Sequence, residues 1–151
     1  MQWTKSDVIQ YLPEKSYVDT LLIPLIPFNP AAEEQMVHQA FQRELNQIFM
    51  NVIEKEFRGR IFLSPDYYYL HGGIEEELER VNEWVDRFSE QPYQYIFLFT
   101  FDPKWKKIER ELNGNLIWIP GMKDGNIQST EIQSFVKEQA DQITELIQGY
   151  W

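Results

Sequence analysis

The apolar residues of this sequence change their spacing repeatedly, and this alternation limits the folds that the chain can adopt. Four short, almost continuous apolar runs predict strands at 17–23, 60–63, 93–101 and 116–119. Apolar residues elsewhere recur every three or four positions, which predicts amphipathic helices over 31–57, over 74–90, from 103, and from 129 to the end. Strands separated by such helices cannot form tight hairpins, so the sheet is expected to be parallel with right-handed crossovers.

The order of these segments predicts the fold class. Alternating strands and helices form an α/β protein, here a three-layer α/β/α sandwich with a four-stranded parallel sheet. The flavodoxin-like strand order 2-1-3-4, counted along the chain, is the favoured topology. A short N-terminal helix, capped by Thr4 and ended by Pro13, precedes the first strand. The length of 151 residues fits one domain over 1–151.

One proline conflicts with a long first strand at the centre of the sheet. Pro24 lacks the N–H group that a strand ladder uses, so the first strand is expected to end at Ile23. Residues 24–30 are then the loop at its carboxyl end. Residues 67–73 are also expected to form a loop.

Charge and composition argue against several classes of protein. The 24 acidic and 14 basic residues leave a formal charge of −10, which opposes binding to nucleic acid or to an anionic membrane. The sequence has no cysteine and therefore no disulfide or thiol nucleophile. Its most apolar window, 21–28, is too short to span a membrane, and the N-terminus lacks the pattern of a secretory signal. A cytoplasmic protein without membrane insertion is expected.

The loops at the carboxyl ends of the strands are the expected place for a ligand, because open parallel sheets bind ligands there. The candidate crevice residues on these loops are Asn29, Tyr67, His71, Thr100 and Asp102. The 64–73 loop and Asp102 also have a structural interpretation, which the pattern favours. The tyrosines of 67–69 can cover the sheet, and Asp102 can cap the helix that Pro103 begins.

Motifs for cofactors and metals are missing. The loop 24–30 contains no glycine, and neither of the glycine-rich phosphate-binding patterns occurs in the chain. The two histidines, His38 and His71, lack the spacing of a metal site. No cofactor and no metal are therefore expected.

A basic cluster after the third strand is the candidate partner surface; it consists of Lys104, Trp105, Lys107 and Arg110. The chain also has 5 Trp, 8 Tyr and 10 Phe and ends with Tyr150 and Trp151, more aromatic residues than one core is expected to hide. The leading hypothesis is a non-catalytic, cytoplasmic protein-interaction or regulatory domain that binds a protein partner or forms a homodimer. The alternative is a small-molecule-binding protein or an enzyme that uses the crevice.

Several segments together resemble the YpiF-like proteins of bacilli. These segments are Trp3 with the early helix, Tyr17 to Thr20 leading into Leu22 to Pro27, and Phe57, Gly59 and Arg60 followed by Leu63 and Pro65. The likeness spans most of the chain in layout. The family is of uncharacterised function, so the resemblance implies no activity and no catalytic residues.

Overall fold

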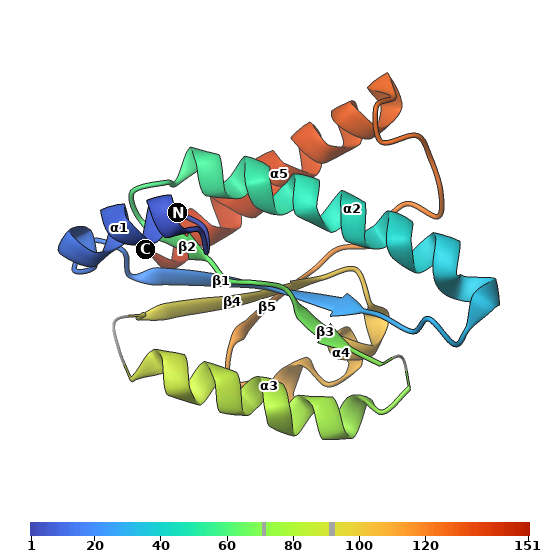
Figure 1. Cartoon of the computed structure of the whole chain (residues 1–151), viewed down its shortest axis with the longest axis horizontal. Helices are drawn as coiled ribbons and strands as arrows, with labels where there is room; N and C mark the ends of the chain where they lie inside the picture. Colours follow the sequence, from blue (N-terminus) through green and yellow to red (C-terminus); the bar gives the residue numbers. More distant parts are fainter. Residues whose placement is uncertain (71, 91–92) are drawn as a thin grey trace.

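The computed structural model describes residues 1–70, 72–90 and 93–151 (Figure 1). Its elements are, in chain order, α1 (Lys5–Glu14), β1 (Thr20–Pro27), α2 (Glu33–Glu56), β2 (Ile61–Leu63), β3 (Tyr67–Tyr69), α3 (Ile74–Ser89), β4 (Tyr95–Thr100), α4 (Pro103–Lys107), the 3₁₀ turn η1 (Glu109–Glu111), β5 (Asn115–Trp118) and α5 (Thr130–Tyr150). None of the described helices is long and apolar enough to cross a membrane.

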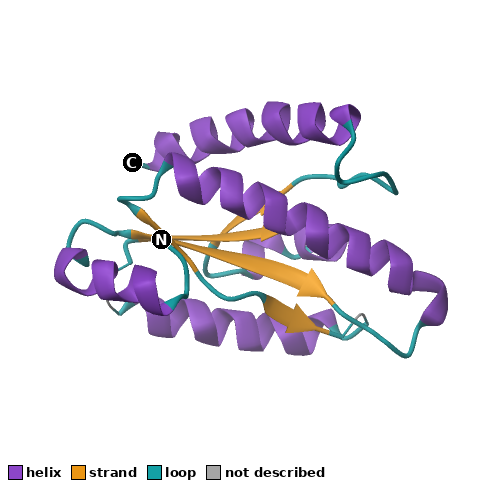
Figure 2. Cartoon of the chain, turned by 45° about the horizontal axis from the view of Figure 1, so that its top comes forward, coloured by secondary structure: helices purple, strands orange, loops and turns teal. Residues whose placement is uncertain are grey.

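The strands form one parallel sheet in the order β2-β1-β4-β5. This is the predicted order 2-1-3-4, because β4 and β5 are the third and fourth predicted strands. Helices α2 and α5 cover one face of the sheet and α3 covers the other (Figure 2). One apolar core lies on each face. The predicted α/β/α sandwich is confirmed.

The sheet has one strand that the sequence analysis assigned to a loop. Residues Tyr67–Tyr69 form β3, which pairs in parallel with Leu25, Ile26 and Pro27 of β1. Strand β3 follows β2 along the same side of β1, after a break at 64–66. The prediction of a loop over 67–69 was wrong, because three residues between Pro65 and Gly72 are too few to show a strand pattern.

The prediction that the first strand ends at Ile23 was also wrong, since β1 continues to Pro27. The reason lies in the direction of the backbone. Leu22 O accepts a hydrogen bond from Ser64 N at 3.0 Å, and Phe28 N donates to Tyr69 O at 2.8 Å, so even-numbered residues of β1 face this edge. Pro24 therefore faces the break between β2 and β3, where no N–H donor is needed.

The two short helices also differ in detail from the predicted ones. The side chain of Thr4 accepts from Asp7 N and caps α1 as predicted, and the helix ends at Glu14, one residue beyond Pro13. Helix α4 ends at Lys107, and the η1 turn follows it, where the apolar spacing predicted one longer helix.

The C-terminal aromatic residue is anchored against the start of β1. The Nε1 of Trp151 donates to Thr20 Oγ1 at 2.9 Å, and the guanidinium of Arg60 lies 4.0 Å from the centre of the indole. Arg60 also holds Asp19 through two bonds of 3.0 and 3.1 Å. Trp151 is thus part of the fold, whereas the sequence analysis counted it toward a partner surface.

Candidate functional site

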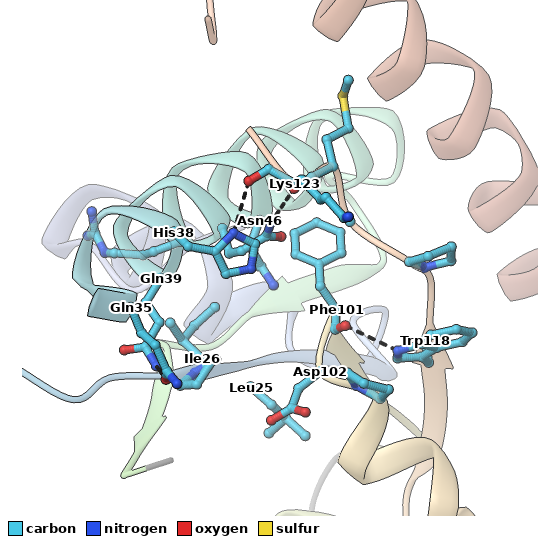
Figure 3. A pocket seen from close by; sticks show the side chains of 17 residues that line it. Leu25, Ile26, Gln35, His38, Gln39, Asn46, Phe101, Asp102, Trp118 and Lys123 are labelled. Carbon is cyan, nitrogen blue, oxygen red and sulfur yellow. Dashed lines mark hydrogen bonds between the residues drawn. The ribbon is translucent and has the colours of Figure 1, made fainter. Parts of the chain in front are cut away.

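A cavity of about 500 Å³ opens at the carboxyl ends of β1, β4 and β5 (Figure 3). Its walls come from the first half of α2, from the end of β1, from residues 101–103 after β4, and from Trp118 and residues 120–123 after β5. The position is the one that parallel α/β sheets use for ligands. The volume lies within the range of roughly 300–1,000 Å³ typical of ligand sites.

Helix α2 supplies most of the polar groups of the cavity, which come from Gln35, His38, Gln39, Gln42, Arg43 and Asn46. Their spacing of three or four residues places them on one side of the helix. The neighbouring side of α2 carries Phe41, Leu45 and Phe49, which are buried in the core. The apolar stripe predicted the helix, whereas the polar stripe beside it was not predicted as part of a site, although the same periodicity reveals both.

Two of these side chains tie α2 to the loop after β5. The Nδ1 of His38 lies 2.9 Å from the carbonyl oxygen of Lys123, and Gln42 Nε2 donates to the carbonyl oxygen of Met122. A carbonyl only accepts, so Nδ1 of His38 carries the hydrogen and faces the loop. The Gln42 bond also fixes its amide, with the oxygen turned away from Met122.

Gly121 makes this arrangement possible. A Cβ atom at this position would lie 2.3 Å from Gln42 Oε1 and 3.1 Å from the ring of Phe101. Any side chain would therefore displace the Gln42 amide or the Phe101 ring. The close approach of the loop to α2 depends on glycine at this position.

Two amides of the cavity are left with unpaired atoms. Asn46 is 1% exposed, and neither its Oδ1 nor its Nδ2 has a hydrogen-bond partner among the described residues. The Oε1 of Gln42 likewise has none there. A buried polar group without a partner costs about 1–3 kcal/mol. These buried amide atoms lower the stability of the protein and would gain hydrogen bonds from any group that reached them.

Asp102 lines the same cavity, but its carboxylate is already occupied. Its Oδ1 accepts from Lys104 N at 3.0 Å and caps α4, and its Oδ2 accepts from the Tyr69 hydroxyl at 2.6 Å. Burial and the Asp102 carboxylate raise the pKa of Tyr69 well above its ordinary value, so the hydroxyl keeps its proton and donates. The structural interpretation of Asp102 as a helix cap agrees with this geometry.

The other candidate crevice residues lie elsewhere. Thr100 is fully buried and accepts from Asp102 N at 3.0 Å, and the Tyr67 hydroxyl donates to Glu77 on α3. Asn29 borders a smaller neighbouring pocket, where its backbone N–H donates to Gln39. His71 lies outside the described residues. Of the predicted residues that are described, Asp102 is the one that lines the large cavity.

The candidate partner surface requires a correction at Trp105. Its side chain is 0% exposed and packs edge-to-face against Tyr69, with the ring centres 5.4 Å apart. The indole faces the core from α4, while Lys107 and Arg110 are exposed and Lys104 is half-buried. A short capped helix must bury its one large apolar side chain, so the tryptophan does not join the basic residues on the surface.

Residues 9–151 match a family described as "Protein of unknown function (DUF2487)". The chain belongs to this family. It is also 27% identical over 106 residues to the uncharacterized protein YpiF of Bacillus subtilis (strain 168), a match that covers 70% of this chain and 69% of that protein. No solved structure matches the chain. The resemblance to the YpiF-like family is thus confirmed, and neither match carries a known activity.

Proposed function

We propose that this DUF2487 protein binds a small polar molecule in the crevice beside α2. The observation that supports this function is the Asn46 amide, which is buried at the wall of a 500 Å³ cavity with both polar atoms unpaired. In folded proteins such buried groups are almost always paired, and exceptions occur at functional sites.

The same geometry favours binding over catalysis. Both oxygens of Asp102 are engaged in hydrogen bonds, and Nδ1 of His38 is directed to the Lys123 carbonyl. Neither side chain is paired with a nucleophile in the described part of the cavity. Since Gln42 and His38 hold the loop that closes one side, a bound molecule would also set the position of that loop, as a regulatory domain requires.

A thermal-shift screen with a panel of cellular metabolites tests this proposal. We expect at least one compound to raise the melting temperature of the natural protein and to lose most of that effect in Asn46→Leu. The matched control is Asn51→Leu, the same change at an exposed position of α2. A panel without any stabilising compound, or a response that Asn46→Leu leaves intact, would contradict the proposal.

Exposed apolar residues favour a second candidate function, homodimer formation through the N-terminal segment. Trp3, Ile9, Leu12 and Tyr17 all lie on or beside α1 and are between 59% and 71% exposed. Sedimentation velocity at high protein concentration should then detect a dimer that Leu12→Glu disrupts. A monomer at every concentration would contradict this candidate. The cytoplasmic location, and the absence of nucleic-acid binding expected from the charge, stay predictions.

A further inference from the structure

We infer that the crevice recognises a planar group of a small molecule that carries a primary amino group next to a hydrogen-bond acceptor. A primary carboxamide and an amino-substituted nitrogen heterocycle both have this chemistry. The inference rests on the proposed small-molecule function and names the ligand class of the same site.

The unpaired atoms at the wall define the groups that a ligand must offer. Asn46 presents one acceptor, Oδ1, and one donor, Nδ2. A carboxylate would satisfy the donor and leave Oδ1 unpaired, whereas an ammonium group would do the reverse. A ligand must therefore bring a donor and an acceptor side by side to pair both atoms of this amide.

Gln42 adds a second acceptor one helical turn away. Its Nε2 is held by the Met122 carbonyl, so the amide cannot turn its nitrogen toward the cavity without losing that bond. Its Oε1 then stays an acceptor. Two acceptors and one donor on neighbouring turns of α2 match an NH₂ group, which has two hydrogens, with an adjacent carbonyl oxygen or ring nitrogen.

The cavity wall opposite α2 suits a planar ligand group. Phe101 and Trp118 lie on the β4 and β5 side of the cavity, opposite the polar side of α2 (Figure 3). The Trp118 indole is held by a bond from its Nε1 to the Phe101 carbonyl oxygen at 3.2 Å. Fixed aromatic and proline surfaces accept planar groups at little entropic cost.

Isothermal titration calorimetry with two matched pairs of compounds tests the inference on the full chain. The pairs are nicotinamide with nicotinate, and adenosine with purine riboside; in each, the second compound lacks the amino group. We expect the amino compound of at least one pair to bind tenfold or more tightly than its partner. The pair that shows the preference also distinguishes a carboxamide from an aminoheterocycle.

Variants of Asn46 test whether its amide atoms cause the preference for the amino compound. Asn46→Asp replaces the Nδ2 donor by an acceptor and should lower the affinity for the preferred compound at least tenfold. Asn46→Leu should lower this affinity to the same extent, while Asn51→Leu should leave it unchanged. Thermal unfolding of each variant checks that it is folded. Equal affinities within both pairs, or affinities that neither Asn46 variant changes, would overturn the inference.

The two levels of the proposal fail differently. If other compounds bind and lose affinity in Asn46→Leu, while neither amino compound is preferred, the ligand class is wrong and the binding function stands. If no compound of the panel or of the pairs binds, both are wrong.

Discussion

At the same end of the strands, buried tyrosine hydroxyls on one face of the sheet are paired with carboxylates, whereas a buried amide on the other face is unpaired. On the face covered by α3, the Tyr67 hydroxyl donates to Glu77 and the Tyr69 hydroxyl donates to Asp102. On the face covered by α2, Asn46 is as deeply buried, yet its amide has no partner among the described residues. The two tyrosine hydroxyls of the first region are paired with carboxylates, although the neighbouring Trp105 Nε1 is buried without a partner among the described residues. In the second region both polar atoms of one amide are unpaired beside a cavity.

This difference separates residues that stabilise the fold from residues that can act on a ligand. Paired buried groups contribute to stability, whereas unpaired ones reduce it and are retained where function requires them. The tyrosine-rich segment 67–69, which stands out in the sequence, is on the stabilising side. Four substitutions test the comparison.

Asp102→Ala should have the largest effect, because it removes the partner of a buried hydroxyl and the cap of α4 together. We expect the free energy of unfolding to fall by about 2–4 kcal/mol in urea titrations. Asp141→Ala, at an exposed position of α5, is the matched control and should change it by less than about 0.5 kcal/mol. A loss below about 1 kcal/mol at Asp102 would show that this region is not closed by its hydrogen bonds.

Tyr69→Phe should lower the free energy of unfolding by about 1–2 kcal/mol at neutral pH, since the Asp102 carboxylate loses a buried donor. The variant should also change the response to alkali. The pKa of Tyr69 is raised on folding from its ordinary 10.0, so its contribution is present below pH 10 and is lost as the pH rises further.

Unfolding titrations between pH 9 and 12 measure this response. The stability of the natural protein should fall above pH 10 by up to about 1.4 kcal/mol per pH unit for each such tyrosine, and Tyr69→Phe should make the slope shallower. Tyr17→Phe, at an exposed tyrosine, should keep the natural slope. Parallel slopes for the natural protein and Tyr69→Phe would show that this hydroxyl is not protected on folding.

Asn46→Leu should change the free energy of unfolding in the opposite direction and by a smaller amount. Replacing an unpaired buried amide with an apolar side chain of similar volume should raise the free energy of unfolding by about 1 kcal/mol. The same urea titrations measure it. A destabilisation of more than about 1 kcal/mol would mean that Asn46 is satisfied in the folded protein and that the two faces do not differ.

His38→Ala should have the smallest effect on stability, below about 0.5 kcal/mol, because the residue is exposed. It removes one of the two bonds that hold residues 122–123 to α2, so limited proteolysis should cut this loop faster than in the natural protein. Gln35→Ala, also exposed on α2, should leave the cleavage rate unchanged. Equal cleavage of His38→Ala and the natural protein would show that this bond does not restrain the loop.

The candidate site was less predictable than the fold. The strand order and the cap at Asp102 follow from spacing and local chemistry. The loop residues predicted for the crevice lie at different places in the fold. The topology of an open parallel sheet predicts the edge where ligands bind and not the side chains that line the site. The polar stripe that ends at Asn46 could have been found by applying the helical period to amides as well as to apolar residues.

The sequence by itself determined the alternation of strands and helices and, through chain connectivity, the parallel sheet, because both depend on periods of a few residues and on the lengths between them. Only the tertiary structure decided which buried polar groups are paired. Their partners are distant in the chain, since Asp102 follows Tyr69 by 33 positions and Met122 follows Gln42 by 80. A hydrogen bond requires its two atoms to lie about 3 Å apart, and a local sequence pattern does not reveal which distant residues come that close.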